Sequence, residues 1–154
     1  MKILIYICFL CCSFSNCNAQ STAKKSKTDA DVAIQFINSY VDHCSQQSST
    51  TDQWIEKNQL LTKNFKSAYK QLVDSANKAD PDLGLDFDPI FDAQDYPDKG
   101  FELVSYNDET GVVTVRGKNW PDFILVMKIA HQANKYLVDG SGIINIPKND
   151  RAKR

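Results

Sequence analysis

The hydrophobic pattern of this chain changes its period once, close to residue 100. Before that point large apolar residues recur at the spacing of amphipathic helices. After it they fall in short runs separated by turn residues, which is typical of β-strands. Helices followed by strands predict an α+β fold in two layers, with the helices covering one face of an antiparallel sheet. We therefore expect a single α+β domain over residues 29–147.

Capping signals and apolar stripes predict the helices. The first helix is expected to begin at Thr28 or Asp29, where acidic residues in the first turn suit the helix dipole. A short turn capped by Thr51 or Asp52 should follow, and then a longer helix over roughly residues 59–78. The apolar face of the first helix is expected to comprise Val32, Phe36, Ile37, Tyr40, Val41 and Cys44.

Four strands are expected in the second half of the chain, over residues 101–106, 112–117, 123–130 and a last strand made of 136–139 and 143–146. Short turn segments separate them, and the segment between the first two has hairpin length. Gly140 and Gly142 indicate a bulge or bend within the last strand. Together these segments predict a four-strand antiparallel meander.

The stretch from Gly84 to Asp98 separates the two halves and alternates aspartates with large apolar residues. Apolar residues of this size favour a core, so we expect the stretch to fold down onto the domain as a structured crossover. Its aspartates could bind calcium, but the spacing does not fit an EF-hand, because Ile90 stands at a ligand position and the required glycine is absent. We expect turn chemistry here, and no metal or other cofactor.

Residues 1–19 have the order of a secretory signal peptide: a positive end, an apolar run from Ile3 to Cys12 and then small residues. The run is too short to span a bilayer, which takes about 20 residues. We expect cleavage after Ala19, a flexible spacer over residues 20–28, and an exported protein, periplasmic or secreted, without a transmembrane helix. The alternative is a membrane anchor through a lipid on Cys17.

Charge and cysteine content exclude some classes of function. The formal net charge is −1, which offers no basis for nucleic-acid binding. Cys44 is the single cysteine after the leader, so no disulfide framework is expected and Cys44 should be a small core residue. Residues 148–154 form a basic tail that should be solvated.

The central stretch also carries a resemblance to a known family. The residues concerned are Gly84, Asp86, Asp88, Pro89, Gln94 and Asp95, followed by the strand that ends at Asp139-Gly140. In these residues the chain resembles exported bacterial proteins of unknown function of the YbjP/YqhG type. The resemblance implies an exported bacterial protein with a cone-shaped domain similar to nuclear transport factor 2. It implies no catalytic residue.

Asp139 is the most distinctive candidate for a binding site, since it interrupts an apolar strand. In cone-shaped α+β domains a polar group on the inner face of the sheet often lines the mouth of a pocket. We therefore predict a ligand site formed by Asp139, Tyr40 and Tyr69. His43 and His131 are expected at the surface or at the ends of elements, and Trp120, in a turn, is expected to be partly exposed as a contact surface.

The chain has no nucleophile elbow, P-loop, dinucleotide fingerprint or zinc-ligand spacing outside the leader. The first hypothesis is therefore a non-enzymatic module of the cell envelope that binds a small molecule or an envelope protein. A second is a small enzyme of the hydrolase or isomerase kind that uses Asp139 and a tyrosine. A third is an immunity-type protein that neutralises a toxin.

Overall fold

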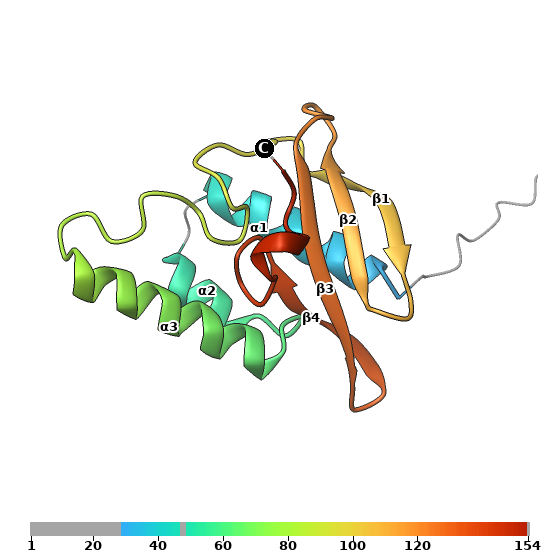
Figure 1. Cartoon of the computed structure of the whole chain (residues 1–154), viewed down its shortest axis with the longest axis horizontal. Helices are drawn as coiled ribbons and strands as arrows, with labels where there is room; N and C mark the ends of the chain where they lie inside the picture. The colour runs from blue at the N-terminus through green and yellow to red at the C-terminus, as the bar shows by residue number, and fades with distance from the viewer. Residues whose placement is uncertain (1–28, 47–48, 154) are drawn as a thin grey trace, which may run out of the picture.

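The computed structural model describes residues 29–46 and 49–153, and within them helices precede strands (Figure 1). The predicted leader, the whole predicted spacer and the possible lipid site at Cys17 lie outside these residues. The elements are α1 (Asp31–Gln46), α2 (Thr51–Lys57), α3 (Lys63–Ala79), β1 (Phe101–Asn107), β2 (Val112–Gly117), β3 (Ile124–Gln132), β4 (Lys135–Ser141) and a 3₁₀ turn, η1 (Lys148–Asp150). The strands pair antiparallel in the order β1-β2-β3-β4, which confirms the α+β class and the meander.

The core lies between one face of the sheet and α1, which crosses that face (Figure 1). Alternate residues of the two middle strands point into it, as the period of a half-buried sheet requires. From these strands it takes Val113, Val115, Leu125, Met127 and Ile129, and from α1 it takes Ala33, Phe36, Ile37, Tyr40 and Val41. The sequence therefore predicted the middle of the buried face of α1 correctly, but Val32 in the first turn and Cys44 in the last are only half-buried.

Helix α3 is attached to the rest of the molecule mainly through its first turns. Phe65 and Tyr69 are its buried residues, and its second half extends away from the sheet (Figure 1). The prediction that this helix begins near residue 59 is wrong. Residues 60–62 are extended because they pair with the outer edge of β4: the Thr62 N–H donates to the Val138 carbonyl over 3.0 Å, and the Val138 N–H donates to the Leu60 carbonyl over 2.8 Å.

The end of the sheet also differs from the prediction. Strand β4 ends at Ser141, and the chain then reverses through Gly142, so residues 143–146 are not part of the strand. The bulge lies one residue before the predicted glycines, at Asp139, because Lys128 and Ile129 of β3 pair with Gly140 and Val138. The tail is not wholly solvated either. The Arg151 guanidinium donates to the carbonyls of residues 143 and 146, which holds η1 against the domain.

The crossover, residues 84–98, packs onto the domain as predicted. Ile90 and Phe91 are both 0% exposed. The Ser141 hydroxyl donates to the Ile90 carbonyl over 2.9 Å, which ties the crossover to the end of β4. Gly142 has φ +59°, and a Cβ there would lie 2.4 Å from the Pro89 carbonyl oxygen. A glycine is needed at this position because the crossover passes so close to the backbone.

Replacing Phe91 by Ala should lower the free energy of unfolding by about 3–5 kcal/mol, because it empties a fully buried aromatic site. The matched variant is Phe87→Ala, which removes a half-buried ring from the same segment and should cost less. Urea unfolding of both variants measures the difference. A loss below about 1 kcal/mol for Phe91→Ala would mean that the crossover does not contribute to the core.

Candidate functional site

A partly buried hydrogen bond joins α1 to the crossover. The Tyr40 hydroxyl donates to Oδ2 of Asp88 over 2.6 Å. Oδ1 of the same carboxylate accepts the backbone N–H groups of Ile90 at 2.8 Å and Phe91 at 3.0 Å. Asp before Pro favours this local turn, in which the side chain bonds to the backbone two and three residues ahead. Asp88 is therefore held in one position by three donors.

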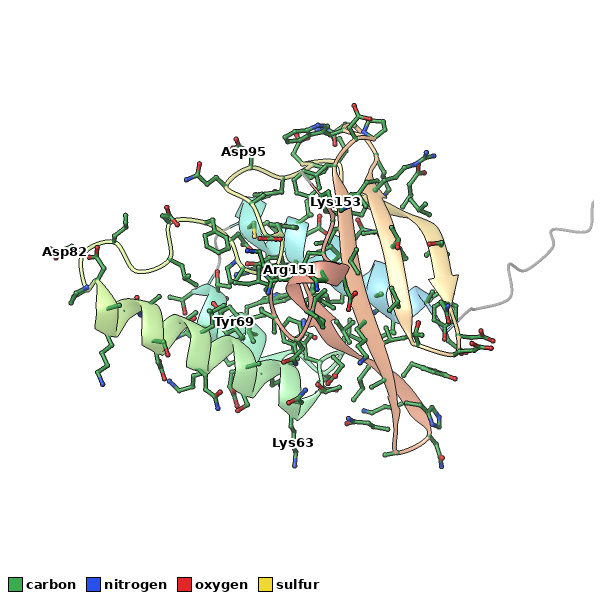
Figure 2. All side chains as sticks on the ribbon, in the orientation of Figure 1. Lys63, Tyr69, Asp82, Asp95, Arg151 and Lys153 are labelled. Atoms are coloured by element: carbon green, nitrogen blue, oxygen red, sulfur yellow. The ribbon has the colours of Figure 1, made fainter. Side chains whose placement is uncertain are left out.

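This carboxylate lines a cavity of about 400 Å³, which we call the Asp88 cavity. One wall comes from α1, α3 and the first residue of α2, and the other from the connection after α3 and the beginning of the crossover. The lining residues are Tyr40, Thr51, Tyr69, Val73, Asn77, Pro81, Asp82, Leu83, Gly84, Leu85, Phe87, Asp88 and Pro89. Figure 2 shows Tyr69 on the inner side of α3 and Asp82 at its outer end, so the cavity follows the half of the helix that leaves the sheet.

The structure brings two of the three predicted ligand residues together. Tyr40 and Tyr69 both line the Asp88 cavity, although their hydroxyls bond to different carboxylates. The Tyr69 hydroxyl donates to Oδ1 of Asp52 in α2 over 2.9 Å. Tyr69 therefore holds α2 and α3 together as well as forming part of the cavity wall.

Asp139 lies elsewhere and has a structural partner. Its Oδ1 accepts the Thr62 hydroxyl at 2.6 Å and the Asn64 amide at 3.3 Å. Thr62 in turn caps α3, since its Oγ1 accepts the Phe65 N–H at 2.9 Å. A β-bulge redirects the bulged side chain, and here it directs Asp139 to the start of α3. Asp139 does not line the Asp88 cavity, so the carboxylate of that cavity is Asp88.

Some of the residues that carry the family resemblance line the Asp88 cavity and others lie outside it. Gly84, with φ +61°, Asp88 and Pro89 form part of the cavity wall. The Gln94 amide donates to the backbone carbonyl of Asp86 over 3.1 Å and so closes the loop between them. Asp86 and Asp95 are exposed. No group of three or more His, Cys, Asp or Glu residues that could hold a metal ion occurs in the part of the chain that the structure describes.

Burial controls the protonation of this region. It raises the pKa of Asp88, although the hydrogen bonds from Tyr40 and the backbone act in the opposite direction. Burial, and then the nearby Asp88 charge, raise the pKa of the Cys44 thiol to about 11. The pKa values of Tyr40 and Tyr69 are also raised, in both cases chiefly by burial. At neutral pH the thiol and both phenols are therefore protonated, and none of them is an activated nucleophile.

His43 is in the last turn of α1, the helix end where it was expected, and it is buried there, at 6% exposed. Its ring stacks on Trp54 of α2 at a centroid distance of 5.1 Å, and Nδ1 has no hydrogen-bond partner among the described residues. Sequence periodicity missed this contact because α2, a separate helix, covers that side of α1. His131 is exposed at the end of β3, beside Tyr136, as expected.

Other hollows of the described residues lie outside the Asp88 cavity, and two of them involve residues named above. One, of about 390 Å³, runs between α2 and α3 over Ile55, Tyr69 and Val73, with charged residues at its rim. The other, of about 480 Å³, lies beside Trp120, whose exposure of 45% confirms the predicted partial exposure.

Comparisons with protein-family models, with curated proteins and with solved structures gave no match to this chain. The resemblance to the YbjP/YqhG type therefore stays a prediction. Within residues 29–46 and 49–153, no helix combines the length and the apolar character needed to cross a membrane.

The raised pKa of Asp88 predicts how stability depends on pH. The native state holds the Asp88 proton more tightly than the unfolded state does. As the pH falls from 7 through the raised pKa of Asp88, the wild type should therefore gain stability relative to Asp88→Asn. The gain ends near pH 3.9, where the carboxyl of the unfolded chain also takes up a proton. Urea unfolding of both proteins across this range measures the difference.

Asp95→Asn, an exposed acid of the crossover, controls for the loss of one charge. A wild-type to Asp88→Asn difference that is constant with pH contradicts the expectation.

Replacing His43 by Phe should raise the free energy of unfolding by about 1 kcal/mol. The new ring keeps the stacking on Trp54 and removes a buried nitrogen that has no hydrogen-bond partner among the described residues. Thermal and urea unfolding test this, with His131→Phe on the exposed strand end as the control, which should change stability by less than about 0.5 kcal/mol. Destabilisation by His43→Phe would show that Nδ1 is satisfied in solution.

Proposed function

We propose that this protein is a non-enzymatic binding module of the cell envelope, which is exported through residues 1–19 and takes a small molecule into the Asp88 cavity. The observation that carries the proposal is the Asp88 carboxylate, which three hydrogen bonds hold in place inside a cavity of about 400 Å³. Ligand sites are typically preformed hollows of 300–1,000 Å³ with a few fixed polar groups. The support for export is the order of charged, apolar and small residues in the leader.

The proposal includes a cone-shaped architecture similar to nuclear transport factor 2. It is supported by α1, which crosses one face of the antiparallel sheet. In this protein, however, the proposed ligand site lies between α3 and the crossover, on the helical side of the core.

A hydrolase or isomerase remains the second candidate, with Asp88 in the role first assigned to Asp139. The raised pKa of Asp88 favours it, since a general acid or base works best with a pKa near the operating pH. The phenols of Tyr40 and Tyr69 make poor partners because their raised pKa values keep them protonated. No histidine is among the described residues that line the cavity. These features favour binding over catalysis.

A cavity-filling variant tests the proposed site. Asn77 is an exposed residue of α3 that lines the cavity, so Asn77→Trp should fill it with little effect on the fold. Ser75→Trp places the same side chain on the same helix outside the cavity lining and is the matched control.

Fragments screened by ligand-observed NMR, and small molecules that co-purify with the protein from the envelope, should bind the wild type and Ser75→Trp. Asn77→Trp should lose most of this binding while its melting temperature stays within a few degrees of the control. Equal binding by both variants, or no ligand for the wild type, contradicts the proposal. Turnover of a bound molecule that is lost in Asp88→Asn would favour the enzyme instead.

A further inference from the structure

The charged residues that line the Asp88 cavity all carry the same sign. Asp82 lies at the outer end of α3, and Asp88 comes from the crossover (Figure 2). No lysine, arginine or histidine is found among the described lining residues. A hollow with carboxylates and no opposing charge attracts cations and repels anions, most strongly where its walls exclude water.

Most backbone donors of one wall are already in use. The N–H groups of residues 82 and 83 donate to the side chain of Asp80, and the N–H of Gly84 donates to its carbonyl. The N–H of Asp88 donates to the Ala93 carbonyl, and the two prolines of this wall have no N–H. An anionic ligand would therefore find few hydrogen-bond donors on this side.

The wall does offer an acceptor. A carboxylate has about four acceptor positions. At Asp88 the Tyr40 hydroxyl and the N–H groups of Ile90 and Phe91 occupy three of them. One position remains on Oδ2 for a donor from a ligand, and the three existing bonds hold the carboxylate where that donor would meet it.

An aromatic side chain supplies a further contact. Tyr40, Tyr69 and Phe87 all line the cavity. Both tyrosine hydroxyls donate to aspartates, and the two tyrosines are buried, so the ring surface that a ligand can reach is mainly that of the half-buried Phe87. The face of an aromatic ring attracts a cation within about 6 Å, and more strongly where water is excluded.

We infer that the ligand of the Asp88 cavity is a small organic cation, an ammonium whose N–H groups donate to Asp88 and whose carbon frame packs on Phe87. The inference rests on the function proposed above and narrows it to one class of ligand. A metal ion fits the cavity less well. Hard cations such as calcium take six or more oxygen ligands, and the described residues contain no cluster of three or more ligating side chains.

Three probes of nearly equal shape and different charge test the class of ligand: benzylamine, benzyl alcohol and benzoate. Binding to the full chain is followed by titration in ¹H–¹⁵N NMR spectra. Benzylamine should bind at least about tenfold more tightly than benzyl alcohol, which corresponds to one charge-assisted hydrogen bond. Benzoate should not bind. The resonances that shift should include those of Thr51, Asn77 and Phe87 in the cavity wall and should exclude Trp120.

Variants that each remove one carboxylate test which aspartate recognises benzylamine. Asp88→Asn keeps the shape and the backbone acceptor of the turn, and should weaken benzylamine about tenfold while benzyl alcohol changes less than about twofold. Asp82→Asn at the outer end of the cavity should weaken benzylamine about two- to threefold, and it remains a usable test if Asp88→Asn does not fold. Asp95→Asn removes an exposed charge outside the cavity and should have no effect.

The outcomes separate this inference from the proposed function. If benzyl alcohol or benzoate binds in the cavity as tightly as benzylamine, the cavity still binds ligands but the cationic class is wrong. If benzylamine binds equally well to the wild type and to both cavity variants, the carboxylates do not recognise it, and the inference fails. If no probe and no neutral fragment binds, both the inference and the proposed function fail.

Discussion

The hydrogen bond between Tyr40 and Asp88 connects residues 48 positions apart, and much of the structure is arranged around it. Tyr40 lies on the helix that crosses the sheet, and its ring contacts Trp54 of α2 and Phe91 of the crossover at centroid distances of 5.4 and 5.1 Å. One side chain thus joins α1 to α2 and to the crossover. Because Tyr40 is 1% exposed, the group that positions Asp88 is part of the core itself.

The Asp88 cavity exists because α3 is held at one end. Asp139 binds the capping Thr62 at the start of the helix, and Tyr69 binds Asp52 two turns later. Beyond Tyr69 the helix has no buried residue, and the chain then returns towards the sheet as the crossover. Segments with few buried contacts open at the lowest free-energy cost. The second half of α3, which forms one wall of the proposed site, is therefore displaced more easily than the Asp88 carboxylate opposite, which the core holds in place.

Local patterns predicted the first two strands more accurately than the start of α3 or the end of the sheet. The bounds predicted for β2 are those observed, and β1 extends one residue beyond its predicted end. These two strands were predicted well because the turn that joins them carries a local signal, Gly111 at φ +71°. The start of α3 was mispredicted because residues 60–62 pair with Val138, far along the chain. Burial of His43 was missed for a similar reason, since Trp54 covers it from another helix. In both cases the deciding contact lies outside the segment whose pattern was interpreted.

The sequence by itself determined the α+β class, the order of the elements and the packing of the crossover, because hydrophobic period and turn residues act over a few neighbouring positions. It also identified Tyr40 and Tyr69 as candidates for one site. Only the tertiary structure decided which carboxylate accompanies them. The bulge in β4 directs Asp139 to Thr62, 77 positions away, while the crossover brings Asp88 to Tyr40. Pairings at such separations depend on how the layers pack, and no local pattern along the chain encodes them.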